Sequence, residues 1–213
     1  MKATAILPVK RFAAAKQRLA AGIDDERRVA VIAAMLEDVL EAIGDVRSIE
    51  RTIVVTGEPG AAELARAAGA EVVEDPGQGG HSGAALAGIA RAEELGARCA
   101  LLLPGDCPLL DPRDVERLLT GLPERYVAIV PDRHGAGTNA LALAPPAAIQ
   151  PSFGEGSRGR HVDAAREAGL AYSVEELPSL GLDLDTPADV IALTRVLAED
   201  RTRAKRTARA LGI

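Results

Sequence analysis

Short apolar segments alternate with longer amphipathic ones along the first half of the chain, and this alternation limits the folds it can adopt. Apolar runs predict buried strands, and between them apolar side chains recur at helical spacing. Strands are expected at residues 3–9, 52–56, 71–74 and 99–103, and helices at about 25–43, 61–68, 82–95 and from 111 onward. Strands that alternate with helices need crossover connections. The pattern therefore predicts an α/β fold with a mostly parallel central sheet and helices on both faces.

The pattern changes in the second half of the chain. Two further strands, expected at 126–130 and 139–143, are joined by the glycine-containing loop 132–138. A segment rich in Gly, Ser and Arg at 152–160 precedes a helix at 161–168, a strand at 171–174 and a helix at 187–199. There is no internal repeat and no interdomain linker, and 213 residues suit one core. We expect a single domain over residues 1–213.

The composition excludes several classes of protein. No apolar run approaches the roughly 20 residues of a membrane helix, and the start of the chain lacks the apolar region of a signal peptide. The two cysteines, Cys99 and Cys107, suit buried thiols in a reducing compartment. A formal charge of −6 argues against a general nucleic-acid binder. We therefore expect a cytoplasmic protein whose partners include neither nucleic acid nor membrane.

Residues 201–213 form a basic tail without an acidic residue. Its cations are Arg201, Arg203, Lys205, Arg206 and Arg209. Such a tail can bind polyanions, but an exposed helix end or a frayed terminus is the commoner structure.

Three aspartates are candidate metal ligands. The apolar run at 99–103 stops at a Pro-Gly pair and presents Asp106 at the carboxyl end of a strand, where open α/β sheets place ligands. Asp183 and Asp185 are two residues apart, which puts both side chains on one face of an extended segment. Oxygen ligands suit Mg²⁺ or Mn²⁺, which take one or two carboxylates plus substrate phosphates. The set indicates phosphoryl or nucleotidyl transfer.

Helix capping is the alternative explanation for these acids. Asp183 can cap, and Asp185 can be the N-cap of the helix that starts at Pro187. Asp111 fits an N-cap better than a ligand. Asp106 has no evident structural use, so it is the strongest candidate.

The loop after the first strand is basic and would leave the same edge of the sheet as Asp106. Its cations are Lys10, Arg11, Lys16 and Arg18. Cations of this kind stabilise the charge that develops as pyrophosphate leaves a triphosphate, although a solvated helix end explains such a run as well. This loop contains neither a P-loop nor a GxGxxG motif.

Three glycine-containing loops could contact a ligand. The glycine-rich loop after Asp75 opens a helix and contains His81. A flexible turn explains its glycines equally well, with His81 exposed to solvent. The other two resemble an anion pocket for a second substrate. They are Gly137-Thr138-Asn139, at a strand start, and residues 153–160, just before a helix.

Five ordered motifs resemble the CofC/FbiD guanylyltransferases of coenzyme F420 biosynthesis, over about residues 3–198. They are LPVKRFAAAKQRL at 7–19, LLLPGDCPLL at 101–110, DRHGAGTNALAL at 132–143, FGEGSRGRHVDAA at 153–165 and LGLDLDTPADV at 180–190. The resemblance implies a Rossmann-like nucleotidyltransferase domain of the glycosyltransferase-A type. It implies transfer of GMP from GTP to a phosphorylated three-carbon acid, with release of pyrophosphate.

The resemblance also implies roles for individual residues. Thr138, Gly154 and Ser157 would bind the acid, Asp106, Asp183 and Asp185 would hold the divalent metal, and Lys10, Lys16 and Arg18 would face the triphosphate, with Asp106 and Lys16 as the catalytic pair. The acid would be phosphoenolpyruvate or 2-phospho-L-lactate. Phosphoenolpyruvate is favoured because the Arg- and Ala-rich composition is typical of bacteria. Residues 80–83 depart from the family pattern for base contacts, and a homo-oligomer is compatible with the sequence.

Other functions remain open from the sequence. A guanylyltransferase acting on 3-phosphoglycerate belongs to the same reaction class. A MobA-like or sugar-phosphate nucleotidyltransferase would usually open with a glycine-rich loop that residues 7–19 lack. A metal-dependent glycosyltransferase would turn over a nucleotide sugar, and a silent binding subunit would release no pyrophosphate from GTP.

Overall fold

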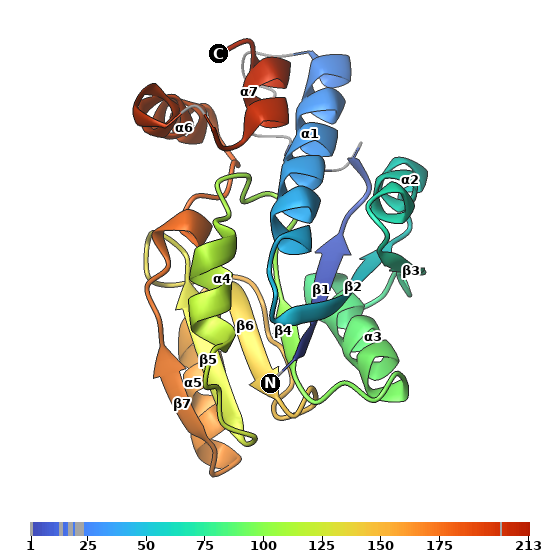
Figure 1. The fold of residues 1–213 in the computed structure, drawn as a ribbon, viewed down its shortest axis with the longest axis vertical. Coiled ribbons are helices and arrows are strands. Elements are labelled where there is room, and N and C mark those ends of the chain that lie inside the picture. Colours follow the sequence, from blue (N-terminus) through green and yellow to red (C-terminus); the bar gives the residue numbers. More distant parts are fainter. Residues whose placement is uncertain (1, 13–14, 17–18, 20–23, 201) are drawn as a thin grey trace.

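A computed structural model describes residues 2–12, 15–16, 19, 24–200 and 202–213. Its sheet has seven strands in the order β3-β2-β1-β4-β6-β5-β7 (Figure 1). The strands are β1 (Ala3–Val9), β2 (Ile49–Thr56), β3 (Glu71–Val73), β4 (Ala100–Leu102), β5 (Tyr126–Pro131), β6 (Thr138–Ala144) and β7 (Ala171–Val174). The α-helices are α1 (Asp25–Gly44), α2 (Pro59–Ala67), α3 (Gly80–Glu94), α4 (Pro112–Leu119), α5 (Ser157–Glu167), α6 (Pro187–Glu199) and α7 (Lys205–Leu211), with a short 3₁₀ turn at Pro178–Leu180.

The sheet is mostly parallel, and one strand reverses it. β1 pairs in parallel with β2 and β4, β2 with β3, and β5 with β7. β6 runs antiparallel to both of its neighbours, β4 and β5. The predicted α/β class and mostly parallel sheet are confirmed.

Alternate residues of each strand supply two separate cores. Along β1, Ala5 and Leu7 pack with the apolar sides of α1, α2 and α4, whereas Ile6 packs with α3 and α5. This alternation is the period-two pattern of a strand with helices on both of its faces. The sheet is consequently buried from both sides, which fixes the edge at which its loops emerge.

Helix α5 begins at Ser157, four residues before the predicted start at His161. Gly154 and Gly156 adopt positive φ angles of 109° and 70°, and Gly156 is the helix N-cap. The glycines therefore form only the turn before the helix. Asp185 is likewise not the cap of α6, because the capping box is formed by Thr186 and Asp189.

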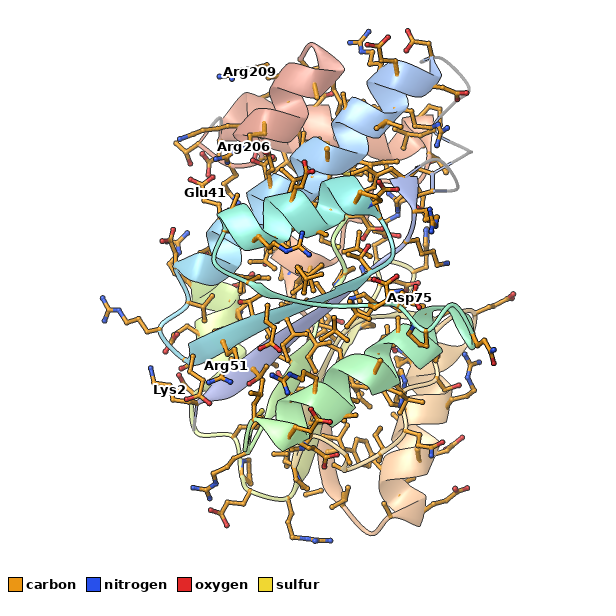
Figure 2. All side chains as sticks on the ribbon, turned by 90° about the vertical axis from the view of Figure 1, so that its right-hand side faces the viewer. Lys2, Glu41, Arg51, Asp75, Arg206 and Arg209 are labelled. Atoms are coloured by element: carbon orange, nitrogen blue, oxygen red, sulfur yellow. The ribbon has the colours of Figure 1, made fainter. Side chains whose placement is uncertain are left out.

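The basic tail is a docked helix rather than a frayed end. Helix α7 lies beside α1 (Figures 1 and 2), and the backbone N–H and hydroxyl of Thr207 both donate to the buried Asp38 carboxylate, at 2.9 and 2.7 Å. Arg206 pairs with Glu41 and Asp38 of α1, so part of the tail's charge is neutralised within the chain. Arg209 is exposed. Within the described residues, no helix has the length and hydropathy required to span a membrane.

The contact between α3 and the sheet predicts a sharp difference between two glycines. A Cβ at Gly88 would lie 2.3 Å from Cγ2 of Ile6 and 3.0 Å from Cγ2 of Val55, whereas nothing lies within 4 Å of a Cβ at Gly44. We expect Gly88→Ala to lower the free energy of unfolding by about 1–3 kcal/mol through overpacking. Gly44→Ala should leave it unchanged or raise it by up to about 1 kcal/mol. Urea unfolding of both variants measures the difference, and equal effects would contradict the close packing of α3.

Candidate functional site

A cavity of about 320 Å³ opens at the carboxyl ends of β1 and β4. Val9 and Lys10 line it from the end of β1, Gly105 and Asp106 from the loop after β4, and Asp185 from the segment before α6. Ala15 and Lys16 contribute from the loop after β1, and His81 from the first turn of α3. Four segments that are distant in sequence therefore meet at the sheet edge where open α/β folds bind ligands.

The loop after β1 is held in place by side chains from two helices. The buried Arg28 of α1 donates from Nη1 to the carbonyls of Phe12, at 3.2 Å, and Ala15, at 2.5 Å. Glu58, the N-cap of α2, accepts from the backbone N–H of Phe12 at 3.0 Å. These bonds position Lys16, whose φ of 56° is rare for a residue with a side chain.

Lys16 bridges two of the predicted metal ligands. Its ammonium group forms ion pairs with the carboxylates of Asp106 and Asp185, and its side chain is only 11% exposed. Burial by itself lowers the pKa of Lys16, but the charge of Asp106 and the hydrogen bonds to both carboxylates outweigh burial and raise that pKa well above its ordinary value. Lys16 is therefore a fixed positive charge at the floor of the cavity.

Negative charge still exceeds positive charge around Lys16. Burial, together with the nearby charges of Asp106 and Asp185, raises the pKa of Asp183 above its ordinary value. Asp106 Oδ1 is buried and has no hydrogen-bond partner among the described residues. An orphaned carboxylate oxygen beside two further carboxylates has the donor chemistry of a divalent cation site.

The three aspartates do not form a closed ligand set in this structure. Across the described residues, no three His, Cys, Asp or Glu side chains are grouped as metal ligands. Lys16 instead contacts both Asp106 and Asp185 with its ammonium group.

Backbone and amide contacts hold the two acidic loops together. The N–H of Leu184 donates to the carbonyl of Asp106 at 3.2 Å, which joins the loop after β4 to the segment before α6. Asn139, near the start of β6, donates from Nδ2 to the carbonyl of Leu180 at 2.7 Å. Asp185 is therefore placed by the loop that precedes α6 as well as by its contact with Lys16.

Two residues of this support were not recognised in the sequence. Asp189 accepts from the backbone N–H groups of Asp185 and Thr186, at 2.9 and 2.7 Å, and Arg133 forms an ion pair with it at 2.5 Å. Burial tends to raise the pKa of Asp189, but the hydrogen bonds from Thr186 and Asp185 and the charge of Arg133 lower it overall. The Thr-x-x-Asp spacing of a capping box was the available signal.

The candidate acid-binding residues lie where α5 meets β6. The Ser157 N–H donates to the carbonyl of Gly154 at 3.0 Å, so the two residues share the turn at the start of α5. Ser157 is fully buried, and its Oγ has no partner in the part of the chain that the structure describes. Thr138 Oγ1 lies 3.0 Å from Nδ1 of His161, one turn along α5 from Ser157. The structure thus brings Thr138 and α5 together.

The remaining predicted residues have different outcomes. Lys10 is exposed and lines the cavity, as expected for a contact to a triphosphate. Arg18 lies outside the described residues. His81 is partly buried and lines the cavity rather than facing solvent, and burial lowers its pKa despite the opposing charge of Asp106. His81 lies in the first turn of α3, directly after the loop that begins at Asp75 (Figure 2).

The fold, an α/β domain with one reversed strand in its sheet, has relatives among solved structures. Its architecture is similar to that of a solved nucleotidyl transferase from Methanothermobacter thermautotrophicus, with a TM-score of 0.66 and 19% identity. The match covers 93% of this chain and 98% of the other. At this level of identity the similarity establishes the fold.

The family follows from the sequence comparisons. The model described as "Guanylyl transferase CofC like" matches residues 3–213, and the chain belongs to this family. The resemblance inferred from the five motifs is thereby confirmed.

The curated relatives differ in the acid that they are named for. A phosphoenolpyruvate guanylyltransferase of Conexibacter woesei is 47% identical, covering 97% of this chain and 94% of the relative. A 3-phospho-D-glycerate guanylyltransferase of Phenylobacterium zucineum is 38% identical, covering 91% and 90%. A 2-phospho-L-lactate guanylyltransferase of Methanothermobacter thermautotrophicus is 34% identical, covering 89% and 83%.

The buried His161 predicts a loss of stability in acid. Burial, with a smaller effect of Arg160, lowers the pKa of His161 from 6.5 to about 4. Because the folded-state pKa lies below the unfolded value, stability is complete above about pH 6.5 and falls as the pH approaches 4. We expect this group to account for about 3 kcal/mol of that loss.

His161→Gln should flatten the stability–pH curve by this amount, because glutamine does not titrate. His134→Gln, which alters an exposed histidine, is the matched control and should keep the wild-type slope. Urea unfolding at pH 7.5, 6 and 4.5 provides the measurement. A wild-type slope in His161→Gln would show that other groups cause the acid loss.

Proposed function

We propose that this chain transfers GMP from GTP to phosphoenolpyruvate, with release of pyrophosphate, in coenzyme F420 biosynthesis. The observation that carries the proposal is the convergence of Lys16, Asp106 and Asp185 on one cavity at the carboxyl edge of the sheet. The choice of acid is supported by the 47% identity to a phosphoenolpyruvate guanylyltransferase, against 38% and 34% to relatives named for other acids.

Asp106, Asp183 and Asp185 would hold Mg²⁺ or Mn²⁺. The fit is supported by the unpartnered Asp106 Oδ1 and by the Lys16 ammonium, which pairs with two of the carboxylates at once. Such an ion, when bound, withdraws charge from the α-phosphate and from the departing pyrophosphate.

The cations of the loop after β1 would bind the triphosphate. Lys10 is exposed where it lines the cavity, whereas Lys16 is largely buried and held by two carboxylates. A preorganised charge such as Lys16 stabilises developing negative charge without reorganisation cost. Arg18 would join them, as the sequence predicts.

The acid would bind between the start of β6 and the start of α5. The hydroxyls of Thr138 and Ser157, with the backbone turn at Gly154, would hold it as an anion. Its phosphate oxygen would attack the α-phosphorus of GTP: a new P–O bond forms, the bond from that phosphorus to the bridging oxygen of the β-phosphate breaks, and pyrophosphate leaves. The nucleophile is already ionised, so the step needs no general base.

The cellular setting belongs to the same proposal. We place the enzyme in the cytoplasm, with GTP and a phospho-acid as its partners and with a homo-oligomer as a compatible state. The supporting observation is that Cys99 and Cys107 are both buried free thiols. Burial raises the pKa of the Cys107 thiol, which keeps it protonated and unreactive.

Pyrophosphate release tests the function directly. GTP and Mg²⁺ are supplied with one acid at a time: phosphoenolpyruvate, 2-phospho-L-lactate or 3-phosphoglycerate. Mass spectrometry identifies the product. We expect release and a guanylylated product with phosphoenolpyruvate. Turnover with another acid alone would correct the substrate, and release with none from a folded protein would refute the function.

Asp106→Asn tests the catalytic carboxylate. The change retains the size of the side chain but removes a charge that faces both Lys16 and the proposed cation, so we expect kcat to fall at least about 100-fold. Glu63→Gln, at an exposed position of α2, is the control and should keep wild-type activity. Circular dichroism confirms folding of both variants. Wild-type turnover by Asp106→Asn at saturating Mg²⁺ would contradict the assignment.

A further inference from the structure

We propose that His161 is a positioning residue that fixes the hydroxyl of Thr138 as a hydrogen-bond donor to the phospho-acid, an inference that rests on the proposed function. His161 is fully buried on α5, and both of its ring nitrogens have partners. It lies four residues after Ser157, so the two side chains occupy the same face of the helix.

The two hydrogen bonds select one tautomer of the imidazole. The backbone N–H of Ser152 donates to Nε2 of His161 at 2.9 Å, so Nε2 carries a lone pair. In a neutral imidazole the proton then resides on Nδ1. Nδ1 lies 3.0 Å from Oγ1 of Thr138 and must be the donor in that contact.

The tautomer determines what the threonine hydroxyl can do. A hydroxyl has one proton to donate and two lone pairs that accept. Because Oγ1 of Thr138 accepts from His161, its own proton is free for another acceptor, and the described residues supply no further partner for it. A free donor at the start of β6 suits an anionic ligand, as does the unpartnered Oγ of Ser157.

The surroundings of His161 keep the ring neutral. Burial and the neighbouring cation Arg160 both disfavour the imidazolium, and the ring of Phe153 packs against it edge-on, with centroids 5.4 Å apart. Among the described residues, no carboxylate is found to stabilise the charged form of His161. A protonated ring would also direct a second N–H against the Ser152 N–H. Above about pH 5 the side chain therefore presents one donor and one acceptor.

The bond to Ser152 has a separate, structural purpose. Ser152 and Phe153 precede the turn at Gly154, and the next backbone N–H, that of Phe153, donates to Ser82 Oγ of α3 at 3.0 Å. His161 and Ser82 thus hold this loop from two helices. A test must separate the anchoring of the loop by Nε2 from the orientation of Thr138 by Nδ1.

Two isosteric variants make this separation. Glutamine can place an oxygen near the position of Nε2 and accept from Ser152, but it leaves Thr138 without its donor. Asparagine can place an N–H near the position of Nδ1 and donate to Thr138, but it leaves Ser152 unpaired. We expect His161→Gln to raise the KM for phosphoenolpyruvate about tenfold, the effect of one lost hydrogen bond. The KM for GTP should stay within about twofold.

His161→Asn should show the opposite pattern. It should lower the Tm more than His161→Gln does, while retaining most of the affinity for the acid. A combined change adds a second criterion: Thr138→Val and the double variant Thr138→Val/His161→Gln should have the same KM, because His161 acts through Thr138. Glu63→Gln, at an exposed position of α2, is the control and should keep both KM values.

Additive effects in the double variant would overturn the proposal. A rise of both KM values in proportion to the loss of Tm in each variant would also overturn it, since that is the signature of a purely structural residue. Nitrogen-15 NMR of the wild-type imidazole gives a readout independent of turnover: the expected proton is on Nδ1 between pH 6 and 8, and a proton on Nε2 refutes the tautomer. Absence of pyrophosphate release with all acids would refute the proposed function instead.

Discussion

The site depends on one electrostatic constraint. The ammonium group of Lys16 compensates the charge of two carboxylates that come from loops far apart in the sequence. Asp106 follows β4 and Asp185 precedes α6, and both form ion pairs with Lys16. Without a shared cation, the two partly exposed carboxylates would repel each other across the cavity. Hydrogen bonds hold the loops at the separation that this bridge needs. Arg28 donates to the loop after β1 and Glu58 accepts from it, while the N–H of Leu184 donates to the carbonyl of Asp106.

The same constraint would let the proposed site accept both a metal ion and a nucleotide. A lysine that bridges two carboxylates occupies a position suited to a cation and retains its charge, because the carboxylates raise its pKa. An arriving triphosphate brings negative charge, and a divalent ion brings positive charge. The positive charge of the ion would offset the negative charge of the triphosphate, so the net charge of the site would change little when both bind. Asp106 would contact both cations, because one of its oxygens pairs with Lys16 and the other has no partner among the described residues.

The sequence predicted the sheet and the candidate residues of the site but not the contacts between them. The reasons are physical. Strand-helix alternation depends on local periodicity, so β1 through α4 were predicted closely, and Asp106 could be recognised because a strand ended before it. The contact between Lys16 and Asp185 joins residues 169 positions apart, and no local pattern encodes it. Arg133 was missed for the same reason, because its partner Asp189 is distant in the sequence, whereas Asp189 itself carried the local spacing of a capping box that was not recognised. The start of α5 was misplaced because Gly159 resembles a loop residue, although it lies within the helix.

The reversed strand β6 places Thr138 at the same edge of the sheet as Asp106, where the two proposed substrates would meet. In a parallel strand the first residue lies at the amino edge of the sheet, opposite the ligand-binding edge. β6 runs antiparallel to β4, with Leu141 opposite Leu102, so its first residue, Thr138, lies on the side of Asp106. The loop that follows β6 then returns along the sheet to α5, where the rings of His81, Phe153 and His161 pack in series, with centroids 4.8 and 5.4 Å apart. His81 lines the cavity beside Lys16, whereas His161 contacts Thr138. One row of rings therefore connects the wall of the cavity to the proposed acid pocket, so we expect a change in the loop at residues 152–154 to affect both.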